Sequence, residues 1–65
     1  MSEGSDLTPR IGTVARRQLA LHGITRYEQL DGRSRRELLA IHGVGPKALR
    51  ILAEELSARG QSLQD

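Results

Sequence analysis

Hydrophobic residues recur at helical spacing along most of the chain, and no segment alternates apolar and polar residues as a half-buried strand does. The longest helical stripe consists of Leu49, Leu52, Ala53 and Leu56. Pro46 suits the first position of this helix, and Gly60 suits its end. The pattern predicts an all-α fold, a compact module of four to five helices.

Glycines mark the expected start and end of the first helix. A tight helical turn is expected over residues 7–11, followed by a helix over residues 13–22. Gly12 stands where the N-cap of this helix would be, and Gly23 stands where a left-handed residue would end it.

Two segments match the capping box, in which a hydroxyl and a carboxylate each accept a hydrogen bond from an amide at the helix start. They are segments 25–28 (Thr-Arg-Tyr-Glu) and 34–37 (Ser-Arg-Arg-Glu). They predict short helices over residues 26–30 and 35–41.

The chain divides into a small-residue acidic tail, one domain and a short end. We expect a disordered tail over residues 1–6, a helical domain over residues 7–60 and a C-terminal tail over residues 61–65. Within the domain, residues 11–19 align without a gap on residues 44–52. This repeat predicts two similar units, each a turn that leads into a helix.

The composition limits the classes of protein to which the chain can belong. At 65 residues it holds a single core. The absence of Cys excludes disulfides, thiolate metal sites and a Cys nucleophile. No apolar run is long enough to span a membrane and the first residues do not resemble a signal peptide, so we expect a cytoplasmic protein. Tyr27, the only aromatic residue, is expected in the core or at its rim, with stacking on a base as the alternative.

Charge is unevenly distributed although the net charge is only +2. Nine cations and three anions lie between Leu7 and Ala53, while the two ends are acidic. A basic middle favours an anionic partner such as a nucleic acid.

The segment from Ile41 to Ala48 carries the most specific signal. A helix is expected to end at Ile41, where Gly43 supplies the positive φ of a reversal and Val44 packs into the core. Gly45 would let the backbone approach another surface, and Pro46 starts the next helix.

This turn is expected to present backbone amides at a helix N-terminus, where the helix dipole favours an anion. The amides belong to Val44, Gly45, Lys47 and Ala48, with the Lys47 ammonium beside them. Such a surface suits a phosphate of a nucleic-acid backbone and reads no base edge. The repeat places Arg17 and Arg50 at equivalent positions, and Arg16 is adjacent to Arg17. The predicted nucleic-acid-binding residues are Gly43, Val44, Gly45, Lys47, Ala48, Arg50, Arg16 and Arg17.

The Gly43-Val44-Gly45 core followed by Lys47 and Ala48 resembles the helix-hairpin-helix family. The resemblance implies that Gly43, Gly45 and Lys47 hold a phosphate of double-stranded DNA across the minor groove, with little sequence specificity.

A longer resemblance covers residues 11–63 and is to the C-terminal domain of the bacterial RNA polymerase alpha subunit. It is carried by Gly23-Ile24-Thr25, Gln29-Leu30, Glu37-Leu38-Leu39, Gly45, Lys47, Leu49, Ile51, Glu55-Leu56, Arg59-Gly60 and Ser62-Leu63. It implies a role in transcription. The wider helix-hairpin-helix resemblance leaves DNA repair as a second expectation. Val14 stands where that family has its principal DNA-contacting arginine.

We therefore expect a monomeric DNA-binding module with no enzymatic activity, no cofactor and no metal. The two histidines, His22 and His42, each precede a glycine and are interpreted as helix caps. The alternative is a protein-interaction module of a transcription or repair assembly. Its mark would be an exposed apolar patch, for which the candidates are Leu7, Ile11, Leu21 and Leu63.

Overall fold

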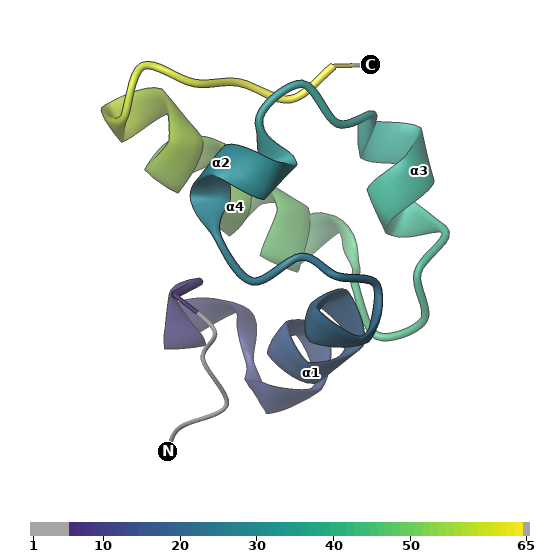
Figure 1. The fold of residues 1–65 in the computed structure, drawn as a ribbon. Coiled ribbons are helices and arrows are strands. Elements are labelled where there is room, and N and C mark those ends of the chain that lie inside the picture. Colours follow the sequence, from purple (N-terminus) through teal and green to yellow (C-terminus); the bar gives the residue numbers. More distant parts are fainter. Residues whose placement is uncertain (1–5, 65) are drawn as a thin grey trace.

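A computed structural model describes residues 6–64 and contains a 3-10 turn and four α-helices (Figure 1). The elements in chain order are η1 (Pro9–Ile11), α1 (Thr13–Leu21), α2 (Tyr27–Leu30), α3 (Arg35–Leu39) and α4 (Pro46–Ala58). No β-strand forms within the described residues, and only Ser34 and Gln64 make an isolated bridge. The prediction of an all-α fold with four to five helices is confirmed.

The predicted ends of the two long helices are confirmed or lie within one residue. Gly12 is the N-cap of α1, and Pro46 is the first residue of α4. The first helix ends at Leu21 with His22 as its C-cap, and Gly23 follows with φ of 79°. Gly60 likewise has φ of 76° after α4. These glycines end helices because they adopt left-handed backbone without a steric penalty.

The start of α2 differs from the prediction by one residue. Arg26 is the N-cap instead of Thr25, and the amide side chain of Gln29 replaces the carboxylate of Glu28 as the acceptor. Gln29 Oε1 accepts hydrogen bonds from the backbone amides of Thr25 at 2.7 Å and Arg26 at 2.9 Å. One side-chain oxygen therefore satisfies two amides that would otherwise lack a partner.

The start of α3 agrees with the prediction, but its end does not. Ser34 Oγ accepts a hydrogen bond from the Glu37 amide at 3.3 Å, as a capping residue does. The helix ends at Leu39 instead of Ile41, since the Ile41 amide donates to Leu38 in a tighter turn.

The core draws large aliphatic side chains from every helix. Those with less than 2% exposure are Leu7, Leu19, Ile24, Leu30, Leu38, Leu52 and Leu56. Ile11 and Leu63 pack against this core from its edge. In Figure 1, α4 crosses the middle of the molecule, with α1 below it and α3 to the right.

Both ends of the described chain, at Asp6 and at residues 61–64, make backbone hydrogen bonds to the domain. The Asp6 amide donates to the Thr25 carbonyl at 2.7 Å, although Asp6 was predicted to belong to the disordered tail. Residues 61–64 run beside the α2–α3 connection (Figure 1), where Gln64 exchanges backbone hydrogen bonds with Arg33 and Arg35, each at 2.7 Å. Residues 1–5 and 65, the remainder of the predicted tails, lie outside the described residues.

Candidate nucleic-acid interface

The α3–α4 connection reverses the chain at Gly43, as predicted. Gly43 has φ of 89°, and a Cβ atom there would lie 2.7 Å from Val14 Cγ1 and 3.2 Å from Gln18 Cγ. Glycine is therefore required both by the backbone conformation and by close packing on α1. The close approach at Gly43 is made to the protein's own helix.

Val44 serves the core and not the surface. Its side chain is buried, and its amide donates to the Ile41 carbonyl at 3.1 Å. The expectation that this amide is available to a phosphate is therefore wrong, because the turn itself uses it. Val44 holds the connection in place between the two helices.

Gly45 has no comparable internal reason to be glycine. Its φ of −105° and ψ of −179° are ordinary extended values that other residues adopt. A Cβ atom there would have no neighbour within 4 Å. The missing side chain leaves the backbone open toward solvent at this point, as a surface approached by another molecule would need.

The N-terminus of α4 has no side-chain cap among the described residues. Gly45 is the N-cap and lacks a side chain, and Pro46 has no amide hydrogen. The amides of Lys47 and Ala48 occupy the next two positions, where no carbonyl of the preceding turn is available within a helix. These two amides and the partial positive charge of the helix end are directed away from α4.

A hollow of about 300 Å³ lies at this helix end. Its lining consists of Arg10, Ile11, Gly43, Gly45, Lys47, Ala48 and Ile51. Four predicted site residues thus meet at one place, and η1 forms the opposite side. Arg10 is not among the residues predicted for this site, although the repeat aligns it with Gly43.

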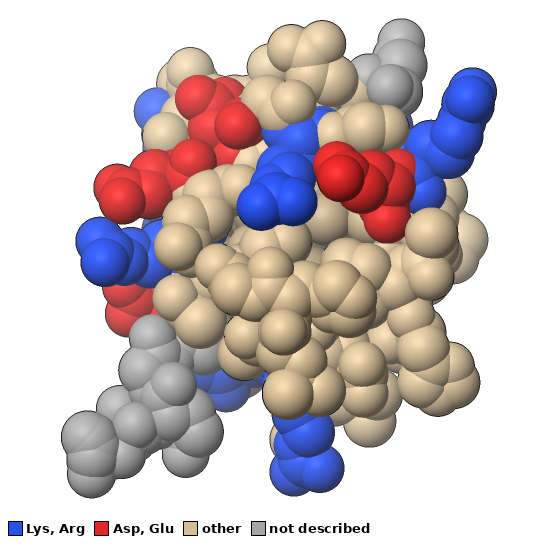
Figure 2. All heavy atoms as spheres, turned by 45° about the vertical axis from the view of Figure 1, so that its right-hand side comes forward, with Lys and Arg blue, Asp and Glu red and all other residues tan. Residues whose placement is uncertain are grey.

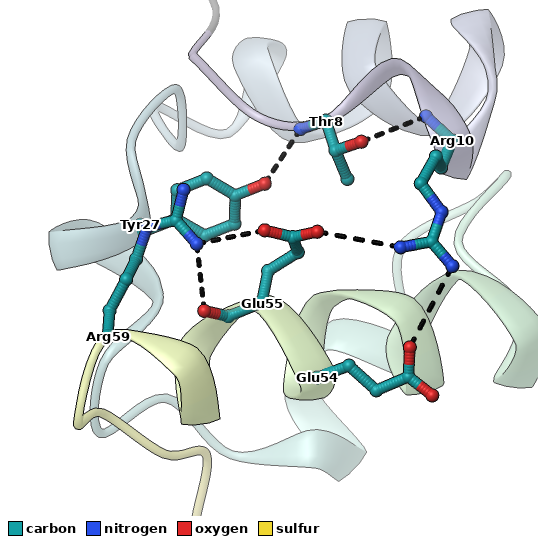
Figure 3. Close-up of polar contacts among 6 residues, drawn as sticks. All are labelled: Thr8, Arg10, Tyr27, Glu54, Glu55 and Arg59. Atoms are coloured by element: carbon teal, nitrogen blue, oxygen red, sulfur yellow. Dashed lines mark hydrogen bonds and ion pairs between the residues drawn. The ribbon is translucent and has the colours of Figure 1, made fainter.

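Carboxylates neutralise a particular subset of the cations. Arg10 pairs with Glu54 at 3.8 Å and Glu55 at 3.5 Å, and Arg59 pairs with Glu55 at 2.9 Å (Figure 3). Two further pairs join Arg26 to Glu28 and Arg33 to Glu37. Within residues 6–64, the cations that form no ion pair with a carboxylate include Arg17, Arg35, Arg36, Lys47 and Arg50.

Opposite charges also mix on the surface. Figure 2 looks from the side of α3 and shows blue and red side chains together in the upper part of this face. Uncharged residues fill the centre of this face, and further cations appear along its lower margin. The basic middle of the sequence therefore does not form one continuous basic face on this side.

The three remaining predicted arginines are divided between α1 and α4. Arg17 and Arg50 are exposed, whereas Arg16 is half-buried. The repeat predicted from sequence is reproduced in the structure, because Gly12 and Gly45 are both N-caps and Leu19 and Leu52 are both fully buried. Arg17 and Arg50 therefore have the same place in their helices, but Arg50 borders a separate groove between α3 and α4.

His22 acts as the predicted helix cap. It is the C-cap residue of α1, and its Nδ1 lies 2.9 Å from the Gln18 carbonyl oxygen. In the part of the chain that the structure describes, no three His, Asp or Glu side chains gather as metal ligands would.

Of the four residues predicted as candidates for an exposed apolar patch, only Leu21 is exposed. Leu7 is buried in the core, while Ile11 and Leu63 are half-buried against it. Leu21 is 73% exposed. The other large exposed hydrophobic residues among those described are Val14 at 57% and Leu39 at 44%.

Comparisons with protein-family models, curated proteins and solved structures find no match to this chain. None of the described helices has the length and apolar character needed to cross a bilayer.

Proposed function

We propose that the chain is a helix-hairpin-helix module that binds double-stranded DNA through its phosphates and has no enzymatic activity. The hollow at the start of α4 receives one phosphate, which takes hydrogen bonds from the amides of Gly45, Lys47 and Ala48. The Lys47 ammonium supplies a positive charge that no carboxylate of the described residues neutralises. Arg17 and Arg50 contact neighbouring phosphates, so the module binds with little base specificity.

Gly45 carries this proposal. Neither its backbone conformation nor its neighbours within the chain require glycine, and it forms part of the hollow. A backbone stripped of its side chain at the end of a helix suits the close approach of a phosphate. The absence of a carboxylate partner for Lys47, Arg17 and Arg50 leaves their charges available to such a ligand.

The nearby carboxylates limit the strength of binding. Glu54 and Glu55 hold Arg10 at the edge of the hollow and add negative charge there. We therefore expect the weak affinity of non-specific DNA binding, with a dissociation constant on the order of 10⁻⁴ to 10⁻⁶ M. Three neutralised phosphates predict a loss of roughly 40-fold in affinity between about 50 and 200 mM salt.

The test is an amide-resolved NMR titration with a short DNA duplex of mixed sequence at those two salt concentrations. The expected result is a set of shifts centred on Gly45, Lys47 and Ala48 that becomes smaller at the higher salt. A duplex that leaves these amides unshifted at low salt would overturn the proposal. Shifts that are equal at both salt concentrations would overturn the phosphate mechanism.

A further inference from the structure

A second hollow, of about 410 Å³, lies between α3 and α4 and is named here the α3–α4 groove. Its lining consists of Arg35, Leu39, Pro46, Leu49, Arg50, Ala53 and Glu54. The groove shares no residue with the hollow at the start of α4. The two hollows occupy different sides of α4, because residues 46, 49, 50, 53 and 54 line one and residues 47, 48 and 51 line the other.

The surface inside the groove is mainly aliphatic and is open to solvent. Leu39 is 44% exposed although it is a large hydrophobic residue, and Ala53 is half-buried. Leu49 is buried beneath them and links the groove to the core. Covering these side chains removes apolar surface from water, so a ligand with its own apolar group gains free energy here.

Positive charges outnumber negative charges along the lining of the groove. Arg35 and Arg50 are exposed and make no ion pair with a carboxylate among the described residues. Glu54 is the only acidic residue of the lining, and its carboxylate is 3.8 Å from the guanidinium of Arg10. The groove therefore offers two unneutralised guanidinium groups beside an apolar floor.

We propose that the α3–α4 groove binds a short acidic segment of a partner protein. A large aliphatic or aromatic side chain of that segment covers Leu39 and Ala53, and its flanking carboxylates pair with Arg35 and Arg50. Guanidinium groups suit this role because they bind carboxylates with two parallel hydrogen bonds. A DNA backbone supplies the anions but no apolar side chain for the floor, so the floor favours a peptide.

This site shares Arg50 with the proposed DNA contacts but does not rest on them, since its floor and Arg35 lie outside the hollow at the start of α4. The experiment is an NMR titration of the full chain with a synthetic amphipathic peptide of Leu, Asp and Glu. Two control peptides carry Ser in place of each Leu, or Asn and Gln in place of each Asp and Glu. We expect shifts at Leu39, Leu49, Arg50 and Ala53, and weaker binding of both control peptides.

Arg35→Glu and Arg36→Glu form a matched pair of variants. The two arginines are neighbours in the first turn of α3 and both are exposed, but only Arg35 lines the groove. Reversing one contacting charge weakens peptide binding roughly tenfold, so we expect this loss for Arg35→Glu. For Arg36→Glu we expect a much smaller change. Retained binding of duplex DNA by Arg35→Glu would show that loss of the peptide is not a loss of the fold or of the DNA site.

Four outcomes would overturn the proposal. Equal losses of peptide affinity in Arg35→Glu and Arg36→Glu would show that the peptide is attracted by the overall charge of the protein and not by the groove. Equal binding of the Ser-containing control peptide would show that the apolar floor is not used. Shifts at Leu39 and Ala53 produced by duplex DNA alone would assign the floor to DNA, whereas a shift at Arg50 alone is expected from the proposed phosphate contact. Groove shifts that grow with protein concentration without peptide would assign it to a second copy of the chain.

Discussion

The guanidinium carbon of Arg59 lies 3.9 Å from the centroid of the Tyr27 ring. The Tyr27 hydroxyl accepts a hydrogen bond from the Thr8 amide at 2.8 Å (Figure 3), and Tyr27 as a whole is only 8% exposed. The only aromatic side chain of the protein is thus covered on its face and engaged at its tip by its own chain. Tyr27 belongs to the core, which excludes the alternative of stacking on a base in this conformation.

Tyr27→Phe tests the hydrogen bond to Thr8. Removal of the hydroxyl leaves the Thr8 amide without this acceptor, so we expect the free energy of unfolding to fall by about 1 kcal/mol. Urea unfolding followed by circular dichroism measures this loss. Faster hydrogen exchange at the Thr8 amide is expected in the variant, and unchanged exchange together with unchanged stability would contradict the role of the hydroxyl.

Arg59→Met tests the cover over Tyr27. The variant retains an apolar chain but loses the contact of the cation with the ring and the ion pair with Glu55, a loss of about 1 kcal/mol in total. Because Tyr27 is the only fluorescent aromatic residue in the sequence, quenching of its emission by acrylamide reports its exposure directly. We expect stronger quenching in Arg59→Met. Arg26→Met, which removes an exposed ion pair with Glu28, is the matched control and should leave quenching unchanged.

Alanine at Gly43 and at Gly45 should have opposite consequences. Gly43→Ala forces a side chain into positive φ and against Val14, so we expect a loss of more than about 2 kcal/mol in stability. Gly45→Ala meets no neighbour, and the lower entropy of its unfolded chain offsets the poorer N-cap, so its stability should change by less than about 0.5 kcal/mol. DNA affinity should nevertheless fall in Gly45→Ala. Unfolding curves and duplex titrations of both variants make the comparison, and full DNA affinity in Gly45→Ala would remove this residue from the interface.

Lys47→Gln is expected to weaken DNA binding without affecting the fold. Loss of one phosphate contact should lower the affinity roughly tenfold at low salt and reduce the slope of log affinity against log salt by about 0.9. Fluorescence anisotropy of a labelled duplex over a salt series gives both quantities. Arg26→Gln removes the same formal charge at a residue that does not line the hollow and serves as the control. Equal effects in the two variants would indicate that only net charge matters.

Removal of residues 61–65 tests the pairing of the C-terminal segment. Ending the chain after Gly60 breaks the hydrogen bonds of Gln64 with Arg33 and Arg35 and the packing of Leu63 on the core. Part of this loss is offset because the freed segment regains entropy, so we expect a net destabilisation of about 2 kcal/mol. Thermal unfolding measures the change, and an unaltered midpoint would show that the pairing contributes nothing to stability.

The helix ends were predictable where one residue type alone determines the local conformation. Gly12, Gly23, Gly60 and Pro46 act through their own backbone, so the sequence places them correctly. The start of α2 was not predictable in the same way, because it depends on where the Gln29 side chain points. Its Oε1 accepts hydrogen bonds from two backbone amides, and the cap lies one residue later than expected. Thr25 and Glu28 also match the capping-box motif, so the sequence alone does not show that Gln29 is the acceptor.

The candidate site was predictable in its centre but not in its surroundings. Gly43, Gly45, Lys47 and Ala48 meet at one hollow because they are adjacent in the chain. The presence of Arg10 in that hollow depends on the packing of η1 against α4, a contact between segments far apart in sequence. The pairing of residues 61–64 was missed for a related reason, since two irregular segments that exchange backbone hydrogen bonds carry no periodic pattern.

The same pairing determines when the fold can form. Helices α2 and α3 have four and five residues, far too few for stability in isolation. They are held from both sides, by Asp6 at Thr25 and by Gln64 at Arg33, so each depends on contacts that close long loops. The two short helices therefore depend on residues from both ends of the domain, and we expect them to form together with the rest of the fold and not ahead of it.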